Sequence, residues 1–98
     1  MKNPLNLEDR HWQIVKQILI TYPYQFYAFG SRARNQAKAL SDLDLCYKEP
    51  IPDYVVSQIE EAFEESDLPF RVEVINWNQC DPTFQQSIEK DLLLLDFA

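Results

Sequence analysis

The spacing of apolar residues divides the 98-residue chain into alternating helix and strand candidates. Apolar residues recur at three- and four-residue intervals over about 7–21 and again over 55–63, which predicts two amphipathic helices. Three other segments are typical of strands, either rich in aromatic residues or alternating in polarity: 24–29, 42–47 and 70–77. The pattern therefore predicts a small protein of mixed helices and strands.

Two further segments are less regular. Residues 31–39 are rich in helix formers and predict one or two helical turns, with Asn35 able to adopt a left-handed conformation. The segment 82–98 begins with Pro82 behind a candidate cap, Asp81, and ends in four consecutive leucines. We expect a terminal helix packed on the sheet; the alternative is an exposed apolar edge that docks a partner.

Composition favours one compact unit and disfavours a nucleic-acid-binding role. With 46% hydrophobic residues, the chain can form one core, and we expect a single domain over residues 1–98. Nine Lys and Arg residues against sixteen Asp and Glu residues give a net charge of -7, opposite in sign to a phosphate-binding surface. A basic protein partner, or a nucleotide held through metal ions, suits this charge better.

The cysteines and the longest apolar runs bear on location. Cys46 and Cys80 have no metal-ligand spacing, and we interpret both as free thiols of a reducing compartment. No apolar run approaches the ~20 residues that cross a bilayer, and the first residues lack a signal-like apolar core. We therefore expect a cytoplasmic protein without membrane association.

The only glycine and three acids form the candidate chemistry. Gly30 and Ser31 follow a predicted strand, where a glycine lets backbone approach a ligand and a hydroxyl can bind phosphate. Ten residues separate Ser31 from Asp42, and we expect Asp42 and Asp44 on one face of the next strand. Glu73 lies on the third strand and either joins these acids or is a surface residue paired with a neighbouring arginine.

Together, these residues suit metal-assisted transfer from a nucleotide. Closely spaced carboxylates repel each other unless a cation lies between them, and their oxygens are ligands that Mg²⁺ prefers. In a two-metal arrangement, one ion holds the triphosphate and the other activates an attacking hydroxyl, so that pyrophosphate leaves.

The joint pattern resembles a known superfamily. "GSRARNQAKALSDLDL", from residue 30, followed by "DLPFRVEVINW", from residue 67, is similar to the polymerase-beta-type nucleotidyltransferases. The closer similarity is to their minimal branch, the MNT domains, over roughly residues 8–90. The resemblance implies an α/β fold with a mixed three-stranded sheet flanked by helices.

The resemblance also implies roles for individual residues. The expected metal ligands and catalytic residues are Asp42, Asp44 and Glu73, and the expected nucleotide contacts are Gly30, Ser31, Arg32 and Arg34. Arg32 and Arg34 have the alternative of being surface charges. The family usually has Asp where this chain has Glu73, whose extra methylene shifts the carboxylate by about 1 Å, a displacement that can cost ~100-fold in rate.

Members of the MNT branch resemble antitoxins of HEPN-domain ribonuclease toxins. The resemblance implies ATP as substrate, two Mg²⁺ ions, and transfer of AMP to a hydroxyl of the toxin, on a tyrosine. Because of Glu73, the alternative is a catalytically weak protein that neutralises its toxin by binding alone. A third hypothesis, transfer to a small molecule such as an aminoglycoside, would need a second, acceptor-binding domain. The sequence leaves open whether the chain also forms homo-oligomers.

Overall fold

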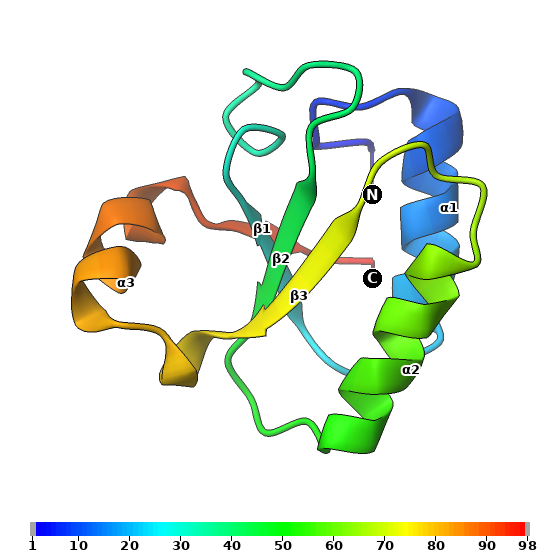
Figure 1. Ribbon diagram of the computed structural model, residues 1–98. Coiled ribbons are helices and arrows are strands. Elements are labelled where there is room, and N and C mark those ends of the chain that lie inside the picture. The colour runs from blue at the N-terminus through cyan, green and yellow to red at the C-terminus, as the bar shows by residue number, and fades with distance from the viewer. Residues whose placement is uncertain (1, 98) are drawn as a thin grey trace.

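A mixed four-stranded sheet organises the protein in a computed structural model that describes residues 2–97. The strands follow the order β3-β2-β1-β4 across the sheet (Figure 1). Their bounds are Phe26–Phe29 for β1, Leu43–Tyr47 for β2, Val72–Asn76 for β3 and Leu93–Leu95 for β4. β1 runs antiparallel to both of its neighbours, whereas β2 and β3 are parallel.

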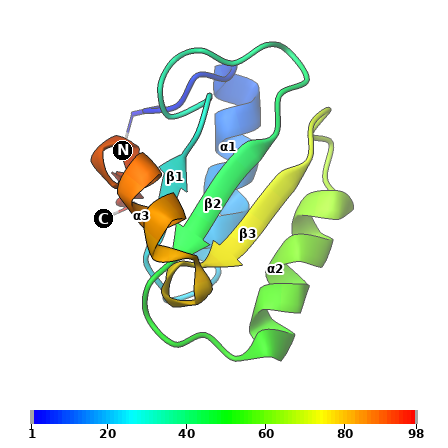
Figure 2. The ribbon, with the colours of Figure 1, turned by 60° about the vertical axis from the view of Figure 1, so that its left-hand side comes forward.

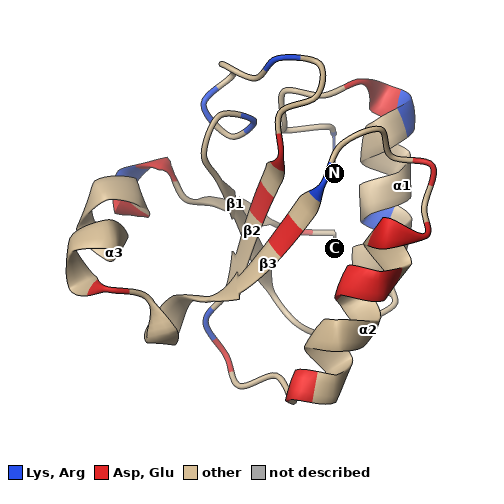
Figure 3. Ribbon diagram, in the orientation of Figure 1, with Lys and Arg blue, Asp and Glu red and all other residues tan. Residues whose placement is uncertain are grey.

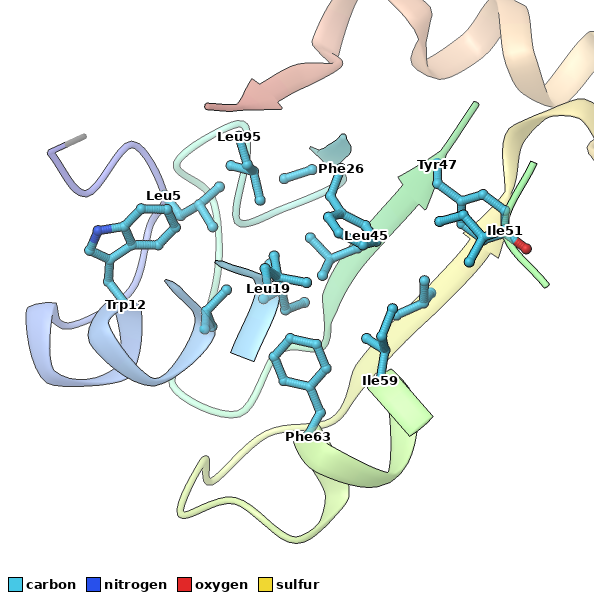
Figure 4. Packing of buried hydrophobic residues seen from close by; sticks show 14 of the residues in the cluster. Leu5, Trp12, Leu19, Phe26, Leu45, Tyr47, Ile51, Ile59, Phe63 and Leu95 are labelled. Carbon is cyan, nitrogen blue, oxygen red and sulfur yellow. The ribbon is translucent and has the colours of Figure 1, made fainter. Parts of the chain in front are cut away.

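Two amphipathic helices cover one face of this sheet (Figure 1). They are α1, Asp9–Ile20, and α2, Asp53–Glu64, and each turns a stripe of three buried apolar residues toward the strands. These stripes consist of Trp12, Val15 and Leu19 in α1 and of Val55, Ile59 and Phe63 in α2. They pack against alternate strand residues such as Phe26 and Leu45, which form the core of the molecule (Figure 4).

A short helix, α3, Pro82–Ile88, lies on the opposite side of the sheet from α1 and α2 (Figure 2). Its predicted cap is confirmed, because the Thr83 backbone N–H donates to Asp81 Oδ1 at 2.7 Å. The Gln85 side chain donates to the Trp77 carbonyl at 2.7 Å, which ties α3 to the 3₁₀ turn that follows β3. α3 is therefore anchored at both its start and its middle.

The leucine-rich segment corrects two expectations. The terminal helix ends at Ile88, and after a 3₁₀ turn, Glu89–Asp91, the leucines form β4 beside β1. Leu93 and Leu95 point into the core while Leu94 is exposed, which is the two-residue period of a strand. Four identical apolar residues show no such period in the sequence. The sheet thus has four strands rather than the expected three. Residue 98, in the same predicted helix, lies outside the described residues.

The mixed α/β class is confirmed, and the five other predicted elements are present with small shifts of their ends. The one or two helical turns expected over 31–39 reduce to turns at residues 31–35, with no helix. No helix of residues 2–97 combines the length and apolar character needed to span a membrane.

Candidate active site

Two acids lie side by side on the face of the sheet opposite α1 and α2. In β2, Leu43 and Leu45 point into the core, so Asp44 between them points the other way. The parallel register pairs Asp44 with Glu73 of β3, and adjacent strands are only about 4.8 Å apart. Figure 3 shows these acidic positions next to each other in β2 and β3. The sequence prediction that they converge is thus consistent with the strand pairing.

Asp42 directly precedes β2 and is two residues before Asp44. The Leu43 N–H donates to the Arg71 carbonyl at 2.9 Å, which extends the β2–β3 pairing to the start of β2. No ion pair joins Glu73 to Arg71 among the described residues, so the structure gives no support to the surface-pair alternative.

The three acids share one electrostatic environment. Burial raises the pKa of the half-buried Asp44 carboxyl above its ordinary value, and the negative charges of Glu73 and Asp42 raise it further. The ionised form of Asp44 is therefore disfavoured, and a bound cation would relieve both the burial and the repulsion.

Gly30 lies against the Asp44 carboxylate. A Cβ atom built on Gly30 would come within 2.5 Å of Asp44 Oδ2, and the residue has a positive φ of 78°. Any other residue would meet both the carboxylate oxygen and the strain of the left-handed region. The single glycine of the chain is thus required where the turn after β1 crosses the acid of β2.

The turn after Gly30 is tightly wound. The backbone N–H groups of Ala33 and Arg34 both donate to the Gly30 carbonyl at 3.1 Å. Asn35 has a φ of 59°, which confirms the predicted left-handed break. Ser31 and Arg34 belong to this turn, which begins at Gly30 beside Asp44. The Ser31 side chain is half-buried, and the Arg34 side chain is exposed.

Arg32 differs from Arg34 because its side chain is buried, with 4% exposure. Its guanidinium donates to the backbone carbonyls of Asn6, Lys38, Ala39 and Ser41 and lies 4.0 Å from the centre of the Phe70 ring. Burial lowers the pKa of Arg32 from its ordinary range, while the nearby Asp42 carboxylate opposes that change. Its predicted contact with nucleotide remains a prediction, and its observed contacts fix the loop before Asp42.

Sequence reasoning missed Asn6, which completes this loop. The Asn6 side-chain carbonyl accepts from the Ala37 backbone N–H at 2.9 Å, and the Asn6 backbone N–H donates to the Arg32 carbonyl at 2.8 Å. A single asparagine near the start of a chain carries no periodic or motif signal, so nothing in the sequence indicates this role.

The acids suit Mg²⁺ by their chemistry, although they are not gathered into a closed cluster. Within residues 2–97, no group of three or more His, Cys, Asp and Glu side chains is close enough to hold a metal ion. Mg²⁺ commonly binds through one or two carboxylates and completes its shell with water and substrate phosphates. The oxygen donors and the raised pKa of Asp44 fit such an ion.

A cavity of about 560 Å³ lies away from the acids. The first turn of α1, residues 37–40 and Arg32 contribute to its lining.

Comparison with known proteins agrees with this arrangement. Residues 13–96 match the family described as "Polymerase beta, Nucleotidyltransferase". The chain is also 39% identical, over 90 residues, to a "Probable protein adenylyltransferase MntA" of Haemophilus influenzae, an alignment that covers 88% of this chain and 79% of that protein. The chain therefore belongs to the polymerase-beta-type nucleotidyltransferase family and is an MNT-type nucleotidyltransferase.

Proposed function

We propose that this enzyme is an Mg²⁺-dependent protein adenylyltransferase that acts as an antitoxin, transferring AMP from ATP to a tyrosine hydroxyl of a HEPN-domain toxin. The observation that carries the proposal is the close approach of Gly30 to Asp44, which joins a phosphate-binding turn to a carboxylate pair. The minimal domain we assign to this activity is residues 1–98.

Each part of the site has a role in this reaction. Ser31 and the backbone at Gly30 bind the triphosphate, and Arg34 adds a positive charge from the exposed side of the turn. Asp42, Asp44 and Glu73 would hold two Mg²⁺ ions, which neutralise the phosphates and lower the pKa of the attacking hydroxyl when bound. The assignment of Glu73 rests on its pairing with Asp44.

The transfer is a single displacement at the α-phosphorus. The tyrosine oxygen forms a bond to that phosphorus, the bond to the bridging oxygen of the β-phosphate breaks, and pyrophosphate leaves. Glu73, on the side of Asp44 away from β1, would orient the hydroxyl and accept its proton.

The choice of a protein acceptor rests on the relative and on charge. The Haemophilus influenzae relative is named a probable protein adenylyltransferase. The net charge of -7 favours a basic protein surface over a nucleic acid. We place the reaction in the cytoplasm, because Cys46 and Cys80 are free thiols that suit a reducing compartment.

Glu73 also supports a second candidate, an antitoxin that neutralises its partner by binding alone. The longer side chain places its carboxylate differently from the Asp that is usual in the family, and a shift of about 1 Å can cost ~100-fold in rate.

Intact-mass spectrometry of a HEPN-domain partner separates the two candidates. After incubation with the enzyme, ATP and Mg²⁺, the partner should gain mass equal to added AMP, and the double variant Asp42→Asn, Asp44→Asn should abolish that gain. A stable complex without any mass change would refute transfer and favour neutralisation by binding.

A further inference from the structure

Phe84 of α3 is an exposed aromatic residue next to the acidic site. Its side chain is 38% exposed, and its ring meets Phe29 edge to face, with 5.9 Å between the ring centres. Phe29 ends β1 and is paired directly with Asp44 in the antiparallel register. Phe29 therefore contacts the exposed ring and is the cross-strand neighbour of Asp44.

The strand order places Phe84 on one side of the site. Gly30 follows β1, whereas Glu73 belongs to β3, and β2 with Asp44 lies between them. In the proposed reaction, a triphosphate at the Gly30 turn would lie on the β1 side, and the acceptor hydroxyl would approach from the Glu73 side. Phe84 is on the β1 side, because its ring packs on Phe29.

The ring is held in place before any ligand binds. The residue before Phe84 is fixed by the Asp81 cap, and the residue after it donates to the Trp77 carbonyl. Phe29 supports the ring through its edge. These contacts restrict the motion of α3 and of the Phe84 side chain. Stacking of a base on the ring therefore costs little further conformational entropy.

From this geometry we infer that Phe84 is the stacking platform for the purine base of the bound nucleotide. The inference rests on the proposed function for the position of the triphosphate. Stacking of a base on an aromatic side chain is worth between about 5- and 150-fold in affinity, and it discriminates little between bases. The platform therefore raises the affinity for a nucleoside triphosphate above the affinity for a triphosphate chain that lacks a base.

The test compares ATP with inorganic tripolyphosphate, which lacks the base, by calorimetric titration in Mg²⁺. We expect Phe84→Ala and Phe84→Leu to weaken ATP binding about tenfold, to leave tripolyphosphate binding unchanged, and Phe84→Tyr to retain wild-type affinity. Leu keeps apolar packing against Phe29, so it separates loss of the ring from loss of α3. Tyr54→Ala, which removes an exposed ring of α2, is the matched control and should bind both ligands normally.

Three results would overturn the inference: wild-type ATP affinity in Phe84→Leu, equal weakening of ATP and tripolyphosphate, or a defect confined to binding of the protein acceptor. Titration also separates this inference from the proposed function. Ring-dependent ATP binding without any transfer to a protein would uphold the platform and refute the proposed reaction, whereas a wild-type protein that binds no ATP would refute both.

Discussion

The two faces of the sheet are built from the same strands but hold opposite chemistry. Leu45 and Asp44 are neighbours in β2, yet Leu45 is fully buried under α1 and α2, whereas Asp44 lies half-buried opposite Glu73. The face covered by α1 and α2 buries apolar side chains, and this burial stabilises the fold. The other face brings together carboxylates that repel each other, an unfavourable energy that a bound cation would offset.

This comparison shows how a small domain separates stability from activity. The residues of the helical face determine whether the sheet forms, and the formed sheet then sets the distance between Asp44 and Glu73. Substitutions on the face covered by α1 and α2 should therefore change the free energy of unfolding, whereas substitutions on the acidic face should change the transfer rate.

The largest effect is expected for Asp44→Asn. If Asp44 is a metal ligand as we propose, loss of the carboxylate should lower the transfer rate on the order of 100- to 1,000-fold, because a negative charge that would hold the cation is removed. The free energy of unfolding at pH 7 should stay equal or rise, since the raised pKa of Asp44 means that its ionised form opposes folding above that pKa. Kinetic assays and urea unfolding measure the two quantities; a less stable variant would contradict the division between faces.

Leu45→Ala tests the other face one residue away. Removing this fully buried side chain should lower the free energy of unfolding by about 2–5 kcal/mol, because the transferred apolar area is lost and a cavity remains. Below the new melting temperature, the affinity for ATP should be unchanged. A loss of ATP affinity in fully folded protein would show that the faces are not independent.

Gly30→Ala should change both the free energy of unfolding and the transfer rate. The positive φ and the contact with Asp44 Oδ2 should together lower the free energy of unfolding by about 1–3 kcal/mol. The displaced carboxylate should also reduce turnover. Combining the change with Asp44→Ala, which removes the side-chain atoms that crowd the Gly30 position, checks the cause: if the contact is responsible, the two effects on stability will not add.

The smallest effect is expected for Arg34→Ala. As an exposed residue of the turn, Arg34 should contribute about 1 kcal/mol to ATP binding and less than about 0.5 kcal/mol to stability. Arg32→Ala is the matched comparison and should lower stability more, because four backbone carbonyls lose their donor. Equal thermal melting of the two variants would contradict the structural role of Arg32.

Most of the fold could be predicted because each segment has a local signal. Helical spacing marks α1 and α2, aromatic residues mark β1, alternating polarity marks β2 and β3, and Asp81 with Pro82 marks the start of α3. The sequence could not assign β4, since four leucines fit a helix or a strand equally well and the choice depends on the distant partner β1. The candidate acids were found from spacing, and the register places Asp44 beside Glu73. Arg32 and Arg34 look alike in sequence, and only the folded turn determines which of them is buried.

The pairing of β1 with β4 has a consequence for the route of folding. Phe26 pairs with Leu95, 69 residues further along the chain, whereas the other neighbour of β1, β2, follows after the much shorter connection 30–42. Closing the longer loop costs more entropy, so β4 docks late and leaves the outer edge of β1 unpaired until then. In a concentrated solution, the leucine strand of a second molecule can fill that edge, and strand exchange between chains then competes with closure of each monomer.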